Sequence, residues 1–411
     1  MKFHSDIIKI KDSTELNLHL TSLNKQKEIS SDIVNVWDKS VKVEESSYYW
    51  NNSSIILEKP TSKTDKPTVV ELFCGCGGTS MGFEMAGFHV ALGADIHIPS
   101  WRTFAANHPS SSAILGDVRK IKASYIKDVV KSNIDVLIAG VPCQGFSLNN
   151  RKRHSGDERN FLYKEFVRMI KDLKPKAIVL ENVSGMRSAD NGEFVKLIER
   201  DLSKASGMKV KSKMLFARDY GVPQNRKRLI FVGVRGAEFD FDKVVPTHGV
   251  KGRPPFVTIQ EAIGDLPSIK SGETALDYGS SPRFPYQRLM RRNAPKEIQN
   301  HTAPNHPTGT IDRIQSTKPG EPMYTKFKQR IRLAWDIQSP TQVSGGIRPQ
   351  FQFGHPEDNR GLTIRERCRI QSFPDRFLVC GGTVQGRVQT GNAVPPLLAK
   401  AVAKAIKSYL K

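Results

Sequence analysis

Short apolar runs alternate with helical segments through the middle of this 411-residue chain, and this alternation constrains its fold most strongly. Runs of this length and composition are typical of buried strands. They cover residues 68–73, 90–94, 134–139, 176–180 and 229–234. Residues 79–86 and 161–173 lie between them and are expected to be helices. The pattern predicts an α/β fold with a doubly wound, mostly parallel sheet that is covered by helices on both faces.

The composition of the whole chain suggests a division into four parts. Residues 1–66 form an N-terminal extension that ends in a Pro- and Lys-containing linker, and residues 67–237 form the sheet domain. Residues 238–375 are rich in proline, glycine and basic side chains, which predicts a second, smaller, loop-rich domain. Residues 376–411 are expected to return to the sheet domain through a final helix.

The charge of the chain is unevenly placed. The net charge is +22, yet residues 1–66 hold ten basic and ten acidic residues, so the excess lies in the remainder. Residues 281–332 hold eleven basic residues against three acidic ones. A polyanion partner is favoured, because each neutralised phosphate releases condensed counterions, and the alternative is a basic surface that is only solvated.

Composition also indicates the environment and excludes some classes of site. No run reaches the roughly 18 apolar residues that span a bilayer. The first residues lack a secretion signal, and five cysteines without a regular framework fit a reducing cytoplasm. Cys74 and Cys76 have no second pair at zinc spacing, so no metal site is expected.

A glycine-rich turn, residues 74–78, follows the first predicted strand. Glycines allow a ligand to approach the backbone, and the next helix presents its N-terminal amides. Asp95, after the second strand, suits ribose hydroxyls, whereas Asp117, at the end of a third element that closes at residues 115–118, suits an adenine amino group or merely caps a helix. The turn has neither a Walker lysine nor the spaced dinucleotide fingerprint. An adenosine cofactor without a pyrophosphate is therefore favoured over NAD or ATP.

The segment Gly140–Ser147 places a thiol at the carboxyl end of a strand, where open α/β sheets bind ligands. A free cysteine is often a small buried side chain. Cys143, however, lies on a turn that contains glycine and proline and precedes the basic run Arg151–Arg153. This context makes it a candidate nucleophile.

Six motifs in order carry a resemblance to a known family. They are Phe73-Cys74-Gly75-Cys76-Gly77-Gly78, Pro142-Cys143-Gln144, Glu181-Asn182-Val183, Gln224-Asn225-Arg226-Lys227-Arg228, the run from Arg365 to Pro374, and Gly391-Asn392-Ala393-Val394-Pro395-Pro396. Together they resemble the ordered motifs of DNA cytosine-5 methyltransferases of the bacterial restriction-modification type. The resemblance runs from about residue 68 to the C-terminus, except for a variable stretch at 238–338.

The resemblance implies roles for four catalytic residues. Cys143 would add as a thiolate to carbon 6 of cytosine, and Glu181 would hydrogen-bond ring nitrogen 3 and the exocyclic amine. Arg228 would contact the cytosine carbonyl oxygen and order Cys143. Arg226 would support the catalytic loop or a phosphate. Apart from the resemblance, Glu181 could be a helix cap and the arginines could be surface charge.

The resemblance also implies S-adenosyl-L-methionine as the cofactor. The expected cofactor-binding residues are Phe73, Gly75, Gly77, Gly78, Asp95, Ile96, Asp117, Val118, Pro142, Asn392 and Val394. The family often has an aromatic residue after the ribose-binding acid. Ile96 stands there in this chain, so aliphatic packing against adenine is expected.

The implied partner is double-stranded DNA, from which the target cytosine must be flipped. Residues 148–160 are expected to form a mobile loop that closes over this base, or else a solvated surface loop. The domain at 238–375 would read base edges in the major groove. Residues 1–66 are left open as a disordered lead, a DNA-touching arm or a packing segment.

The expected protein is a cytoplasmic, nucleoid-associated monomer, and a cognate restriction endonuclease could act on the same site. Two alternatives stay open: an RNA (tRNA) cytosine-5 methyltransferase, and a non-catalytic DNA-binding protein on the same scaffold. The long basic domain argues mildly against the first. The intact set of Cys143, Glu181 and Arg228 argues against the second.

Overall fold

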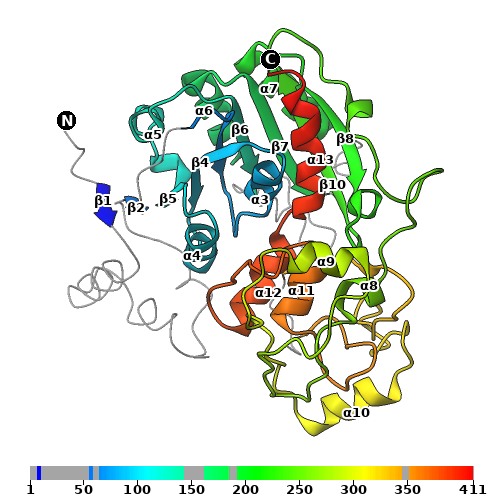
Figure 1. Cartoon of the computed structure of the whole chain (residues 1–411). Helices are drawn as coiled ribbons and strands as arrows, with labels where there is room; N and C mark the ends of the chain where they lie inside the picture. The colour runs from blue at the N-terminus through cyan, green and yellow to red at the C-terminus, as the bar shows by residue number, and fades with distance from the viewer. Residues whose placement is uncertain are drawn as a thin grey trace. The chain divides into compact units, whose positions relative to one another are not determined.

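The computed structural model describes residues 7–10, 55–58, 64–142, 162–183, 185, 192–344 and 351–410. The chain divides into two compact units (Figure 1). The first unit comprises Met1–Leu215, Lys227–Val245 and Ala399–Lys411. The second comprises Phe216–Arg226 and Pro246–Leu398.

The first unit is built on one sheet. Its strands are β1 (Ile7–Ile10), β2 (Ile55–Glu58), β3 (Thr68–Leu72), β4 (His89–Asp95), β5 (Ser112–Leu115), β6 (Val136–Gly140), β7 (Ala177–Val183), β8 (Lys211–Phe216) and β10 (Lys227–Val234), in the order β1-β2-β5-β4-β3-β6-β7-β10-β8. Strands β3 to β7 pair in parallel, whereas β10 runs antiparallel to β7. Every residue of β3 is buried, as expected for a parallel strand covered on both faces. The predicted α/β fold class is confirmed.

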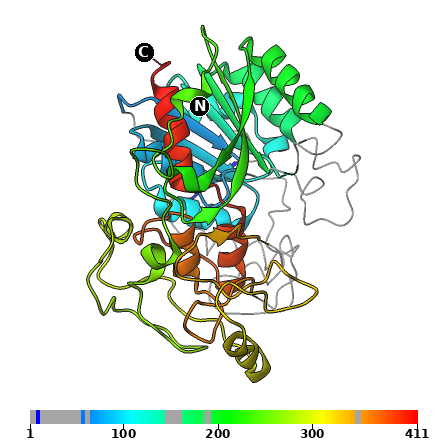
Figure 2. The same ribbon diagram turned by 90° about the vertical axis from the view of Figure 1, so that its right-hand side faces the viewer.

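Helices cover both faces of this sheet. They are α3 (Gly78–Met85), α4 (Ile98–Asn107), α5 (Ala123–Val130), α6 (Tyr163–Leu173), α7 (Glu193–Ser206) and α13 (Pro396–Lys407). Helices α6 and α7 pack on one face, while α13 lies on the other (Figure 2). The apolar spacing of α6 explains its orientation, because Phe166, Met169 and Ile170 are buried against the sheet.

Two short N-terminal strands extend the sheet beyond β5. Strand β2 pairs antiparallel with β5, and β1 pairs in parallel with β2. Leu57 of β2 is buried in the same core as Ile114 of β5. Three roles were left open for residues 1–66. The strands β1 and β2 take the role of a packing segment, because they pair with the edge of the sheet.

The second unit has little regular structure. It contains the strands β9 (Gln224–Asn225) and β11 (Ser339–Pro340) and the helices α8 (Ile259–Ile263), α9 (Pro285–Arg291), α10 (Thr308–Ser316), α11 (Ile364–Ile370) and α12 (Thr383–Asn392). A capping box between Thr363 and Glu366 begins α11. An apolar core of residues from α8, α9 and α11 holds the unit together, and several buried arginines lie around it. The assignment of residues 238–375 to target recognition stays a prediction.

Candidate active site

The carboxyl ends of the parallel strands bring several predicted site residues to one edge of the sheet. Phe73 follows β3, Asp95 ends β4, Pro142 follows β6, and Glu181 lies near the end of β7. Such an edge is where open α/β sheets bind ligands.

The turn after β3 has an unusual backbone. Phe73, Gly75 and Gly77 have φ values of 55°, 54° and 88°, all in the left-handed region. Phe73 is strained there, since an L-residue with a Cβ is disfavoured at such values. Glycine is required at position 77 for a second reason: a Cβ atom would lie 2.4 Å from Nε2 of His108. The glycine turn is therefore shaped by its own backbone and by the buried His108.

Helix α3 begins at this turn without a capping side chain, because its N-cap residue is Gly77. Glu71 of β3 supplies the missing acceptor. Its carboxylate accepts a hydrogen bond from the Ser80 backbone N–H at 3.0 Å and another from the Ser80 hydroxyl group. Burial raises the pKa of Glu71 to about 7. Glu71 was not among the residues predicted from the sequence, although a carboxylate within an otherwise apolar strand was a signal that could have identified it.

Asp95 ties the second strand to the same turn. One carboxylate oxygen accepts from the Gly75 backbone N–H at 2.7 Å, and the other accepts from the His97 backbone N–H, also at 2.7 Å. Burial raises the pKa of Asp95. Phe73, Gly75, Asp95 and Ile96 are partly exposed beside fully buried neighbours. These four predicted cofactor-binding residues thus surround an accessible part of the strand edge.

Asp117 is engaged in local contacts. It caps the 3₁₀ turn Val118–Lys120 by accepting from the Arg119 N–H at 2.9 Å, and it forms an ion pair with the Arg119 guanidinium at 2.6 Å. Burial opposes ionisation, but the bonds from Arg119 outweigh it, so the pKa of Asp117 is lowered. The capping role left open by the sequence is therefore present. Val118 is buried in the core, and its contact with a cofactor stays a prediction.

Strand β6 leads to the predicted nucleophile, whereas Cys143 and residues 148–160 lie outside the described residues. Strand β6 ends at Gly140, which is level with Glu181 in the pairing of β6 with β7. A Cβ at position 140 would lie 3.4 Å from the Phe73 carbonyl oxygen and 3.8 Å from Oε2 of Glu181. Glu181 is thus placed beside the strand end that precedes Cys143 by three residues.

Glu181 forms a buried ion pair with Arg228. Nε of Arg228 lies 2.5 Å from Oε1 of Glu181, and the two side chains are 8% and 12% exposed. Burial raises the pKa of Glu181 against the opposing effect of Arg228, and burial likewise lowers the pKa of Arg228. The pair forms because β10 is antiparallel, so its first residues lie beside the last residues of β7. A carboxyl group and a guanidinium are thereby available side by side.

Arg226 alternates with Arg228, and both are buried while Lys227 between them is exposed. Arg226 belongs to the second unit. Its Nη1 donates to the Gln342 carbonyl at 2.9 Å, and its Nη2 donates to the Gly391 carbonyl at 2.8 Å. These contacts indicate that Arg226 positions backbone segments of its own unit. Whether it also supports the catalytic loop stays a prediction.

The motif near the C-terminus belongs to the second unit. Gly391 is required there, since a Cβ would lie 2.3 Å from the Ser344 backbone nitrogen. Asn392 is exposed at the end of α12, and Val394 is buried. Their roles in cofactor binding stay predictions.

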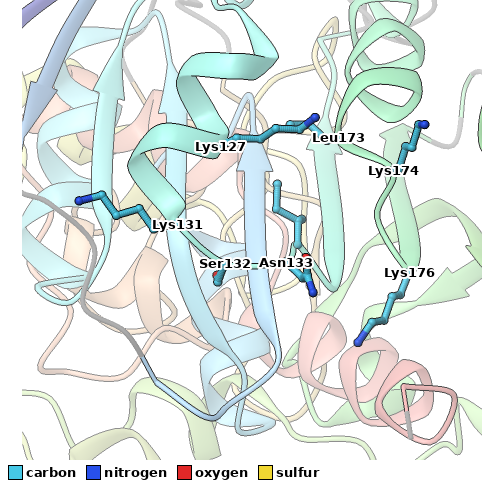
Figure 3. A pocket seen from close by; sticks show the side chains of 8 residues that line it. Lys127, Lys131, Ser132, Asn133, Leu173, Lys174 and Lys176 are labelled. Atoms are coloured by element: carbon cyan, nitrogen blue, oxygen red, sulfur yellow. The ribbon is translucent and has the colours of Figure 1, made fainter. Parts of the chain in front are cut away.

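A separate cleft of about 580 Å³ lies at the opposite edge of the sheet, near the amino ends of β6 and β7 (Figure 3). It is lined by Lys127, Lys131, Ser132, Asn133, Ile134, Leu173, Lys174 and Lys176. None of these is a predicted site residue. Across the residues that the structure describes, no group of three or more His, Cys, Asp or Glu could hold a metal ion, and no helix is long and apolar enough to cross a membrane.

Comparison with known proteins relates this geometry to function. The model of the C-5 cytosine-specific DNA methylase family matches residues 67–408. The chain is 35% identical over 353 residues to the Type II methyltransferase M1.HphI of Haemophilus parahaemolyticus, covering 82% of this chain and 86% of the relative. It is also 35% identical over 372 residues to M.DdeI of Desulfomicrobium norvegicum, covering 84% and 89%. A DNA modification methyltransferase encoded within an Escherichia coli prophage has a similar structure, with a TM-score of 0.69 and 26% identity over 84% of this chain and 99% of that one.

Proposed function

Because this chain belongs to the C-5 cytosine-specific DNA methylase family, we propose that it transfers a methyl group from S-adenosyl-L-methionine to carbon 5 of a flipped cytosine in a short duplex sequence. The observation that carries the proposal is the buried Glu181–Arg228 pair beside the strand that leads to Cys143. A carboxyl group and a guanidinium suit a pyrimidine, whose ring nitrogen 3 and carbonyl oxygen both need polar partners.

The residues at the β3 turn fit a cofactor that contains adenosine but no pyrophosphate. The turn holds no lysine for phosphates, and the partly exposed Phe73, Gly75 and Ile96 offer backbone and apolar contacts. Asp95 retains lone pairs for ribose hydroxyls after accepting two backbone hydrogen bonds. When bound, S-adenosyl-L-methionine supplies a methyl group on a sulfonium.

Two residues of the chain activate the base. The thiolate of Cys143 adds to carbon 6, while Glu181 in its protonated form donates a proton to nitrogen 3. The ring then becomes an enamine whose carbon 5 is nucleophilic. After transfer, a water molecule accepts the carbon-5 proton, the Cys143 thiolate departs, and the proton on nitrogen 3 returns to Glu181, which restores the aromatic ring. The raised pKa of Glu181 supports its part in this scheme, because burial favours the protonated carboxyl group.

Arg228 holds Glu181 in place and offers further N–H groups to the cytosine carbonyl oxygen. The basic second unit would contact phosphates and read base edges, which the excess of positive charge between residues 281 and 332 supports. The relatives are Type II methyltransferases by name. This supports action in a restriction-modification system. We propose in addition that the enzyme works as a cytoplasmic monomer and that a cognate endonuclease acts on the same site.

The test is transfer of labelled methyl groups to duplex DNA and, in parallel, to tRNA. We expect labelled DNA, unlabelled tRNA, and no transfer by a Cys143→Ser variant. A duplex that contains 5-fluorocytosine should trap the wild-type protein covalently. Labelled tRNA with unlabelled DNA would instead establish the RNA enzyme. Tight DNA binding without transfer or trapping would establish a non-catalytic DNA-binding protein.

A further inference from the structure

The cleft at the amino ends of β6 and β7 takes no part in the proposed reaction, and its lining is strongly basic (Figure 3). Lysines supply four of its eight lining residues, and none of the eight is acidic. The exposed acids in the last turns of α5 and α6, Asp128 and Asp172, do not line it. Its volume of about 580 Å³ lies in the range of small-molecule sites, about 300–1,000 Å³. Its size and charge together make it a candidate site for an anion, formed within the first unit alone.

Two helices end at this cleft, and each places a lysine where the helix stops. Lys131 follows α5 and Lys174 follows α6, with φ values of 53° and 50° in the left-handed region. Glycine is the usual residue there, and a residue with a Cβ atom costs about 1–2 kcal/mol. The dipole of the helix favours a positive charge at its end by only about 0.3–1 kcal/mol. The helix ends alone therefore do not account for both lysines.

Little of the positive charge in the cleft is neutralised by the protein. Lys176 forms an ion pair with Asp135, whose Oδ1 lies 2.8 Å from the lysine Nζ. Lys127, Lys131 and Lys174 form no ion pair with any residue that the structure describes. Lys127 and Lys131 stand one helical turn apart, since the Lys131 backbone N–H donates to the Lys127 carbonyl at 2.9 Å, and like charges at this spacing repel. An anion in the cleft would offset this repulsion.

The rest of the lining adds apolar surface and hydrogen-bonding groups. Ile134 and Leu173 are 6% and 7% exposed, whereas the polar Ser132 and Asn133 are exposed. Figure 3 shows Lys127 extended towards Leu173, while the amino group at position 131 points the other way. A lysine stem is flexible and its ammonium group donates three hydrogen bonds, so an exposed lysine can turn towards an anion. The cleft therefore offers mobile cations beside a fixed apolar surface.

The shape of the cleft distinguishes between kinds of anion. A single phosphate group would engage one or two lysines and leave most of the volume unused. A DNA duplex carries its phosphates on a convex surface and would contact the exposed lysines without reaching Ile134 or Leu173. Several linked phosphates can engage Lys127 and Lys174 together through charge-assisted hydrogen bonds. We propose that this cleft binds a small polyphosphate, which is either a nucleoside triphosphate, with its nucleoside against the apolar surface, or inorganic polyphosphate.

The test is isothermal titration calorimetry of the full chain with GTP and with inorganic triphosphate. GTP is used because an adenine nucleotide could also occupy the proposed cofactor site. We expect saturable binding of one ligand per chain that weakens as NaCl is added, because salt screens exposed charges. Tighter binding of GTP would identify a nucleotide as the ligand, whereas equal affinities would identify inorganic polyphosphate.

Paired substitutions then assign the binding to the cleft. Lys127→Met with Lys174→Met removes two charges and keeps unbranched side chains, so binding of both ligands should weaken about tenfold as charge-assisted hydrogen bonds are lost. Lys127→Arg with Lys174→Arg keeps the charges and should bind within about threefold of the wild type. The matched control is Lys204→Met with Lys404→Met, which removes two exposed lysines from the first unit, near the ends of α7 and α13, and should bind as the wild type does. All of these proteins should melt within a few degrees of one another, because exposed charges contribute little to stability.

Three results would overturn the proposal. The first is a wild type that shows no saturable binding of GTP or inorganic triphosphate. The second is an equal loss of binding in the Lys127/Lys174 methionine variant and in the Lys204/Lys404 control, which would indicate general attraction to a basic protein. The third is weaker binding of a DNA duplex by the Lys127/Lys174 methionine variant without weaker binding of GTP, which would make this a nucleic-acid surface. The proposed function is tested separately, since methyl transfer to a short duplex should be equal in the wild type and this variant whether or not the cleft binds a polyphosphate.

Discussion

Glu71 makes the stability of this protein depend on pH in a way that can be calculated. Its carboxyl group is 1% exposed in β3, and burial raises its pKa from 4.5 to about 7 even though Ser80 donates two hydrogen bonds to it. Because the pKa is raised on folding, the stabilising contribution is fully present below about pH 4.5 and is lost as the pH rises through about 7. The pKa of Glu71 in the folded protein is higher than its ordinary value by about 2.5, which corresponds to about 3 kcal/mol in the free energy of unfolding at about 1.36 kcal/mol per pKa unit.

The perturbation is Glu71→Gln, which keeps an acceptor oxygen for Ser80 but cannot ionise. Urea unfolding of both proteins at pH 4.5 and pH 8 gives the change in the free energy of unfolding with pH. We expect the wild type to lose about 3 kcal/mol more than the variant over this range. The control is Glu193→Gln on the exposed side of α7, which should follow the wild type. Equal pH dependence in wild type and Glu71→Gln would refute the reasoning.

Three further predictions concern the site. Urea unfolding of Gly77→Ala should show a loss of about 2–4 kcal/mol in the free energy of unfolding, because of the positive φ and the clash with His108. The control is Gly207→Ala, which has a φ of 68° and no neighbour within 4 Å, and it should lose only about 1 kcal/mol. Glu181→Gln should lower the rate of single-turnover methyl transfer by about 10²–10³-fold with little change in DNA affinity. The wild-type rate should fall as the pH rises through the raised pKa of Glu181, whereas the rate of the variant should not change with pH. A wild-type rate in the variant would exclude proton donation by Glu181. Arg226→Met should lose about 2–5 kcal/mol, because two buried carbonyl groups lose their donors, and unchanged urea unfolding would contradict its positioning role.

Local patterns were enough to identify the main elements of the first unit. Apolar runs predicted the strands that became β3, β4, β6, β7 and β10, and helical spacing predicted α6. Motif order identified the family, which the family match over residues 67–408 confirms. The two N-terminal strands escaped prediction because each has four residues and stands in a segment without a firm period. Their position in the sheet depends on pairing with the edge of β5, which a local sequence pattern does not reveal.

What the sequence alone determined is the chemistry available: a thiol after a strand, a glycine turn, a carboxylate and two alternating arginines. Only the tertiary structure decided which of them act together, because the contacts join residues far apart in the chain. The antiparallel direction of β10 pairs Arg228 with Glu181 across 47 positions, whereas Arg226 binds carbonyl groups of residues 342 and 391. The protonation state of Glu71 depends on its burial in β3. These are properties of the folded interior, which composition and spacing do not specify.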